Sequence, residues 1–101
     1  MRRTRGLLIR GRKNGPWITW NKDPFSNISW VCRIETFKNG QLEGPYFEFW
    51  DNGNLATGGF YLNGKKTGRW AEYWIDTTIL TETHYQDDEP VLVVEYPSRS
   101  I

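Results

Sequence analysis

The sequence predicts an all-β fold, an antiparallel meander of stacked β-hairpin repeats curled into a single-layer sheet. Aromatic residues are abundant, with Trp 6, Tyr 5 and Phe 5 among 101 residues, and these residue types favour strands. The apolar runs are short and alternate in polarity with period two, and none has the period of a helix. Glycine-containing turns separate the runs at regular intervals.

Six to eight strands are expected, at about residues 6–11, 16–20, 29–38, 45–50, 55–62, 69–75, 79–86 and 91–96. The first is a leucine- and isoleucine-containing run before the turn at Gly11. The second, fourth and sixth each follow a glycine, and an aromatic ring lies two residues after that glycine. The third, fifth and seventh end near Phe37, Tyr61 and Tyr85. Pro97 ends the last strand, because proline cannot donate a ladder hydrogen bond.

Three segments repeat one pattern, and they predict that the fold is built from copies of one hairpin unit. Gly15–Trp20, Gly44–Trp50 and Gly68–Trp74 are spaced by 29 and then 24 residues, and the longer spacing reflects a loop-like insertion around 21–27. A glycine pair inside one strand, Gly58-Gly59, predicts a bulge or packing beneath a large ring. The expected organisation is one domain over residues 1–101, with units at about 8–36, 37–60 and 61–84 and a cap at 85–101.

The pattern Asn-Gly-x-x-x-Gly-x-[Trp/Tyr]-x-x-[Tyr/Phe]-Trp resembles the MORN repeat, in particular the variant found in bacterial proteins associated with toxin–antitoxin systems. Residues 60–75 carry it best, 37–50 carry it well, and 8–20 match at four positions, namely Gly11, Gly15, Trp17 and Trp20. The resemblance implies hairpins stacked into an elongated sheet that contacts protein or lipid, and it implies no reaction. The stretched first unit and the last unit, where Asp87-Asp88 replaces Asn-Gly, are interpreted as caps.

The residues with catalytic or metal-binding chemistry are few. Cys32 is the single cysteine and His84 the single histidine, which excludes an internal disulfide and a cysteine-based zinc site. A metal site formed by His84 with Glu82 and Asp87 is the alternative to a structural role for this histidine, and the structural role is favoured. The sequence therefore predicts no metal and no cofactor.

Two carboxylates, Glu48 and Glu72, occupy the same position in successive repeats. Paired carboxylates could perform acid–base catalysis, as in glycoside hydrolysis. No third polar group recurs with them, and charged side chains beside aromatic rings also keep a strand face soluble. The prediction is therefore that the protein is not an enzyme.

The charge is balanced overall, at +1, but the two ends differ in sign. Residues 1–13 carry six basic and no acidic side chains, whereas 71–101 carry seven acidic side chains and one arginine. The low net charge argues against a nucleic-acid-binding β protein, which remains an alternative because basic residues interleave with aromatic ones. Leu7-Leu8-Ile9 is too short for a membrane anchor or a secretory signal, so the expected location is the cytoplasm.

The function predicted from these features is a non-catalytic protein-binding module, in the manner of an inhibitor or antitoxin that neutralises a protein target. A phage-encoded inhibitor of a bacterial defence system, anti-CRISPR-like or similar, would have the same sequence features. Tryptophan and tyrosine are enriched where binding energy is concentrated. The predicted partner-binding residues are Trp17, Tyr46, Glu48, Trp50, Trp70, Glu72, Trp74, Asp87, Asp88 and Glu89. An open sheet edge also predicts a homodimer formed by strand addition.

Overall fold

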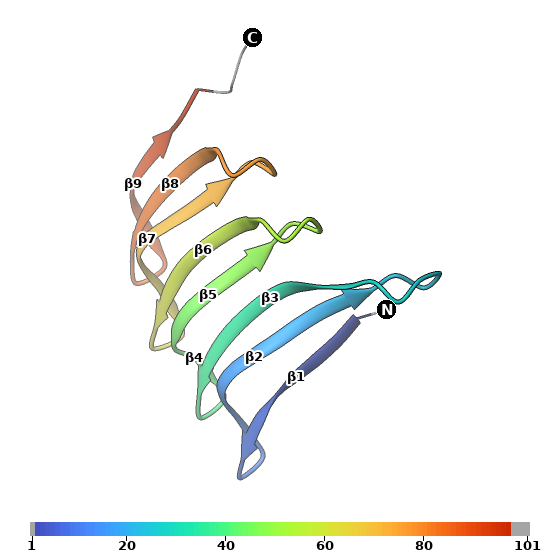
Figure 1. Cartoon of the computed structure of the whole chain (residues 1–101). Helices are drawn as coiled ribbons and strands as arrows, with labels where there is room; N and C mark the ends of the chain where they lie inside the picture. Colours follow the sequence, from blue (N-terminus) through green and yellow to red (C-terminus); the bar gives the residue numbers. More distant parts are fainter. Residues whose placement is uncertain (1, 98–101) are drawn as a thin grey trace.

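The computed structural model describes residues 2–97, which form nine β-strands and no helix. The strands are β1 (Arg2–Ile9), β2 (Arg12–Lys22), β3 (Ser29–Lys38), β4 (Gln41–Leu42), β5 (Gly44–Phe49), β6 (Leu55–Leu62), β7 (Lys65–Tyr73), β8 (Ile79–Gln86) and β9 (Glu89–Glu95). They form one open antiparallel sheet in the order β1-β2-β3-β5-β6-β7-β8-β9, and the short β4 pairs with β3 (Figure 1). The predicted all-β meander is confirmed.

Several strands begin earlier than expected, because the hairpin turns are only two residues long. Backbone φ is positive at both turn residues, 51° and 77° at Arg10-Gly11 and 53° and 80° at Asn63-Gly64. Such turns match the twist of the flanking strands. Residues assigned to the turn signals therefore belong to strands, so β2 starts at Arg12 and β7 at Lys65. β1 starts at Arg2 rather than near residue 6, because its pairing with β2 continues to Arg2 opposite Asn21.

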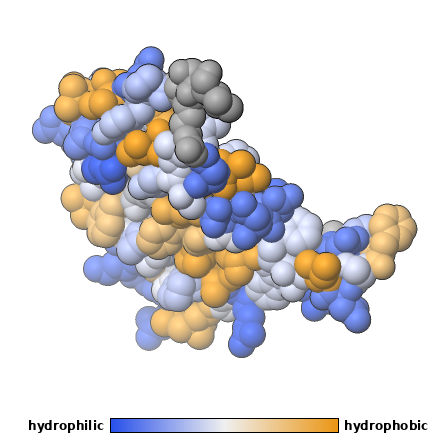
Figure 2. Space-filling model, turned by 45° about the horizontal axis from the view of Figure 1, so that its top comes forward, coloured by the Kyte–Doolittle hydropathy of each residue, from blue (hydrophilic) through white to orange (hydrophobic). Residues whose placement is uncertain are grey.

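The sheet is a single thin layer, and Figure 1 shows its strands side by side in one curved surface. Its extents are 49 × 40 × 13 Å and its radius of gyration is 15.5 Å, against about 13 Å for a compact domain of this length. The accessible surface is 7199 Å², whereas a compact monomer of this mass exposes about 5,900 Å². Figure 2 shows apolar and polar residues interleaved over the visible face.

The repeat is visible in the backbone as bulges at equivalent positions. Gly15, Gly44 and Gly68 all have positive φ, at 75°, 113° and 68°, a conformation that favours glycine. Nearer the other end of the strands, one extra residue recurs every 24 positions. Cys32, Ala56 and Leu80 each lie where the neighbouring strand has no opposing residue. Bulges of this kind bend strands and increase their twist, which accounts for the curl of the sheet.

The best-packed part of the molecule is a ladder of rings on one face of the sheet. This aromatic ladder consists of Trp17, Phe37, Tyr46, Tyr61, Trp70 and Tyr85. Ring centroids are 5.4 Å apart for Tyr46 and Trp70, and 5.1 Å apart for Tyr61 and Trp70. Lys66 places its ammonium 4.8 Å from the Trp70 ring centroid, and Lys13 lies equally close to Trp17. These contacts give a one-layer sheet a compact stripe of packing.

Glycines on neighbouring strands make room for the two indoles of the ladder. A β-carbon on Gly59 would lie 2.0 Å from Cδ2 of Trp70, and one on Gly6 would lie 2.2 Å from Cδ2 of Trp17. Each indole also donates its Nε1 hydrogen to the carbonyl after that glycine, at 3.1 Å for Trp70 to Phe60 and 3.2 Å for Trp17 to Leu7. The predicted packing of a large ring over the Gly58-Gly59 pair is confirmed at Gly59.

Candidate functional site

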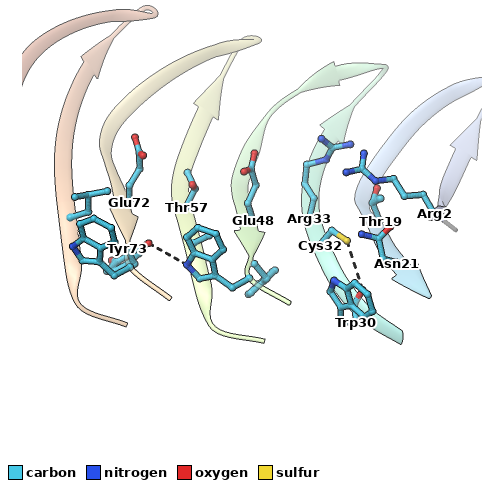
Figure 3. Close-up of a pocket in the computed structure, with 15 residues that line it drawn as sticks. Arg2, Thr19, Asn21, Trp30, Cys32, Arg33, Glu48, Thr57, Glu72 and Tyr73 are labelled. Atoms are coloured by element: carbon cyan, nitrogen blue, oxygen red, sulfur yellow. Dashed lines mark hydrogen bonds between the residues drawn. The ribbon is translucent and has the colours of Figure 1, made fainter. Parts of the chain in front are cut away.

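A row of polar side chains crosses the face that carries the aromatic ladder. This polar row consists of Thr19, Arg33, Glu48, Thr57 and Glu72, each the direct backbone partner of the next on β2, β3, β5, β6 and β7 (Figure 3). Direct partners in a sheet project their side chains to the same face. Only β6 separates the strands of Glu48 and Glu72, which places their backbones about 10 Å apart.

Beside the polar row the surface is hollowed into an open trough of about 450 Å³. Its lining includes the polar row and three indoles, those of Trp30, Trp50 and Trp74. Trp50 and Trp74 follow Glu48 and Glu72 by two residues, so strand alternation brings each indole to the same face as its carboxylate. The two indoles are 38% and 40% exposed, and they offer large apolar surfaces to a ligand.

Matching loops hold the two exposed indoles. The backbone N–H of Trp50 donates to the Asn54 carbonyl, and that of Trp74 donates to the Thr78 carbonyl, both at 2.8 Å. The Trp50 ring is fixed further, because its Nε1 donates to the Tyr73 carbonyl at 3.2 Å. Because the Trp50 ring is already positioned, it would lose little side-chain entropy on contact with a ligand.

The two carboxylates differ in their surroundings. Glu48 is half-buried and accepts a hydrogen bond from the Tyr46 hydroxyl. Burial first, and then this hydrogen bond to Glu48, raise the pKa of Tyr46 above its ordinary value. Glu72 is exposed, and its side chain faces solvent at the trough. The Glu48 carboxylate is therefore held in place by Tyr46, and the Glu72 carboxylate is the more exposed of the two.

The structure brings together four of the predicted binding residues, Glu48, Trp50, Glu72 and Trp74, all of which line the trough. It places Trp17, Tyr46 and Trp70 in the aromatic ladder instead. Trp70 is 6% exposed and Tyr46 is 9% exposed. Both rings therefore pack within the sheet and offer little area to a partner, and their role in binding stays a prediction. For Trp70 the physical reason is Gly59 on the neighbouring strand, which leaves room for the indole over the backbone.

The three predicted acidic residues, Asp87, Asp88 and Glu89, lie at the turn between β8 and β9, away from the trough. Asp88 also has a role in the fold. Its backbone N–H donates to the Lys66 carbonyl at 3.0 Å, and its carboxylate accepts from the Lys66 N–H at 2.7 Å. This turn is therefore a second acidic surface, separate from the carboxylates of the trough.

Trp30 and Arg33 line the trough but were not among the predicted binding residues. Strict alternation puts them on opposite faces, since they are three residues apart. The extra residue at Cys32 shifts the register between β2 and β3, so Trp30 pairs with Asn21 while Arg33 pairs with Thr19. A bulge reverses the alternation. Cys32, Ala56 and Leu80 follow one another at intervals of 24 residues, with no insertion between them. This spacing is the sequence signal that could have located the bulge.

His84 belongs to a separate cluster centred on Glu82. The Glu82 carboxylate accepts from Arg69 Nη2 at 3.1 Å and from the Tyr96 hydroxyl at 2.7 Å, and His84 Nε2 lies 3.4 Å away. The hydrogen bond from Arg69, followed by that from Tyr96, lowers the pKa of Glu82 to about 2. Within residues 2–97, no three side chains of His, Cys, Asp or Glu gather as they would around a metal ion. The cluster ties β7, β8 and the chain after β9 together.

No family model, curated protein or solved structure matches this chain. The resemblance to MORN repeats therefore stays a prediction. In the part of the chain that the structure describes, no helix is long and apolar enough to cross a membrane.

Proposed function

We propose that this protein is a non-catalytic protein-binding module that neutralises a protein target, in the manner of an inhibitor or antitoxin, and that the trough is its contact surface. The observation that carries the proposal is the repeated pair of an exposed indole and a carboxylate. Trp50 with Glu48 and Trp74 with Glu72 line the same trough. Exposed tryptophans in a shaped, partly charged surface are typical of sites where binding energy concentrates.

The shape of the trough favours a macromolecular partner over a small substrate. It is partly open to solvent, it lies on a sheet 13 Å thick, and its lining residues come from strands between β1 and β8. A specific protein interface usually buries about 800 Å² on each partner, an area that a broad, shallow surface can provide. Its lining residues include no histidine. The carboxylates, hydroxyls and guanidinium that remain suit recognition better than proton transfer.

The charges of the trough indicate the chemistry of the partner. Glu48 and Glu72 repeat at a spacing of about 10 Å, and only the Arg2 and Arg33 end of the trough is basic. A partner segment with lysine or arginine side chains would place its cations over the indole faces and near these carboxylates. The acidic turn at residues 87–89 would add long-range attraction for the same basic partner.

The test places a photo-crosslinking amino acid at position 50 or 74, with position 25 as the matched control. Phe25 is 95% exposed and lies in the loop between β2 and β3, outside the trough. We expect one protein to be cross-linked in cells from positions 50 and 74 and not from position 25. Cross-linking to nucleic acid instead, or equal capture from position 25, would contradict the proposal.

The affinity of the purified, identified partner then tests the individual residues. Trp50→Ala and Trp74→Ala should each weaken binding at least tenfold, since truncated hot-spot residues cost about 2 kcal/mol or more. Phe25→Ala should leave the affinity unchanged. Glu72→Gln should slow association and reduce its salt dependence, because Glu72 is exposed. Circular dichroism confirms that each variant is folded, and unchanged affinity in both tryptophan variants would exclude the trough as the contact surface.

A further inference from the structure

The two edge strands of the sheet hold different places in their hairpins, one being a first strand and the other a second strand. β1 is the first strand of its hairpin, as β3, β6 and β8 are, whereas β9 is a second strand, as β2, β5 and β7 are. Every inner second strand pairs on its far side with the first strand of the following hairpin, giving β2–β3, β5–β6 and β7–β8. We propose that a second copy of this chain supplies the missing neighbour, so that β9 of one copy pairs antiparallel with β1 of the next.

The repeat also defines the register of this contact. Glu95 occupies the place of Glu72, since each pairs with a threonine of the preceding strand, Thr81 and Thr57 respectively. Thr4 occupies the place of Thr81 in its own hairpin. Because Glu72 pairs with Thr81 across β7–β8, Glu95 of one copy pairs with Thr4 of the next.

This register brings exposed apolar side chains together. Counted back from Glu95 and forward from Thr4, Leu92 meets Leu7 and Val91 meets Leu8. Their exposures are 54% for Leu92, 59% for Leu7, 61% for Val91 and 56% for Leu8. These are among the most exposed large aliphatic side chains in residues 2–97, and all four lie on the two edge strands. Removing this apolar area from water favours the contact.

A recurring hydrogen bond between consecutive turns extends to the next copy in the same way. In each case the second turn residue donates its backbone N–H to the carbonyl two residues beyond the turn of the preceding hairpin. The bonds are Gly40 to the Lys13 carbonyl at 2.8 Å, Gly64 to the Leu42 carbonyl at 2.9 Å and Asp88 to the Lys66 carbonyl at 3.0 Å. The next bond of this series joins Gly11 of one copy to the Pro90 carbonyl of the copy before it.

Charge selects this arrangement over a two-fold dimer. β1 carries Arg2, Arg3 and Arg5 and no acidic residue, whereas β9 carries Glu89 and Glu95 and no basic residue. Pairing β1 with β1, or β9 with β9, brings like charges together, and pairing β9 with β1 brings opposite charges together. A head-to-tail contact uses two different surfaces, so it can continue into chains or close into a ring. This assembly does not depend on the function proposed for the trough.

The test is a charge exchange between the two edges, followed by sedimentation velocity on the full chain. In variant X, Arg2→Glu and Arg10→Asp put acidic residues on the first edge near the places that Glu95 and Glu89 reach in the proposed register, and aspartate suits the positive φ at this turn position. In variant Y, Glu89→Arg and Glu95→Arg make the last edge basic. The control carries Lys38→Glu and Lys65→Glu, which are exposed positions on inner strands. Circular dichroism verifies the fold of every variant.

The wild type and the control should form species larger than dimers as concentration rises toward roughly 1 mM, and salt should weaken this association. Variants X and Y alone should need at least tenfold higher concentrations, and their equimolar mixture should recover the wild-type behaviour. A wild type that stays monomeric overturns the proposal. So does wild-type association of X alone or Y alone, which would indicate β9–β9 or β1–β1 pairing, and so does a mixture that fails to assemble.

Discussion

The contact between Trp70 and Gly59 supports a quantitative prediction, tested by adding one methyl group beneath the ring. In Gly59→Ala the new β-carbon would lie 2.0, 2.2 and 2.5 Å from three carbons of the indole, whereas carbon atoms prefer about 3.5–4.0 Å. The ring must therefore lift by about 1.5 Å. That displacement lengthens the 3.1 Å bond from Trp70 to the Phe60 carbonyl and loosens the packing against Tyr46.

The expected cost follows from these changes. Overpacking costs about 1–3 kcal/mol and a weakened hydrogen bond about 1 kcal/mol, while the smaller entropy of the unfolded chain returns about 0.4–1 kcal/mol. The free energy of unfolding should thus fall by about 2–3 kcal/mol. Gly58→Ala is the matched control, because its nearest atom, Leu55 Cδ2, lies at an ordinary 3.5 Å. That variant should be neutral or slightly stabilised.

Urea unfolding followed by circular dichroism measures both variants. Equal stabilities for Gly59→Ala and Gly58→Ala would refute the assignment of the indole to Gly59. A Trp70→Leu background supplies a second check, since without the indole the Gly59→Ala penalty should largely disappear. If the penalty persists there, the methyl group acts through the backbone rather than through the ring.

Two further predictions concern the charged groups of the sheet. Glu82 has a pKa of about 2 in the folded chain against an ordinary 4.5, so its stabilising effect is complete above about pH 5 and is lost as the pH falls toward 2. The difference in unfolding free energy between the wild type and Glu82→Gln should therefore be constant from pH 7 to pH 5 and shrink at pH 3, and a difference independent of pH would contradict this. Lys66→Met removes a cation 4.8 Å from the Trp70 ring centroid and should lower stability by about 0.5–1 kcal/mol in urea unfolding. A stability equal to that of the wild type would show that the cation contributes nothing.

Local patterns were sufficient to predict where most strands lie and four of the residues that line the trough, Glu48, Trp50, Glu72 and Trp74. The turn at Asn63-Gly64 follows from residue chemistry, because Asn and Gly both tolerate positive φ. The common face of Glu48 and Trp50 follows from strand alternation alone. The place of a ring over Gly59 follows from a glycine where a strand would ordinarily carry a side chain.

The remainder depends on contacts between strands. Arg10-Gly11 forms a two-residue turn although arginine seldom adopts positive φ, so the start of β2 could not be read from residue preference. Trp30 reaches the trough only because of the bulge at Cys32. In a one-layer sheet both faces show the same alternation, so the pattern does not reveal which tryptophans the neighbouring strands cover. Residues on the adjacent strand determine that Trp70 is buried and that Trp74 is exposed.

In this single-layer sheet, the aromatic ladder that stabilises the fold and the trough lie on the same face. The strands β5 and β7 carry ladder rings near one end and trough residues near the other, so each strand serves both regions. Tyr46 is the direct link, because its ring packs in the ladder while its hydroxyl holds Glu48 in the polar row. A partner that binds the trough therefore covers a surface whose geometry the ladder maintains. Since a ligand that binds only the folded chain raises its stability, a partner bound at the proposed contact surface would stabilise the thin sheet that carries it.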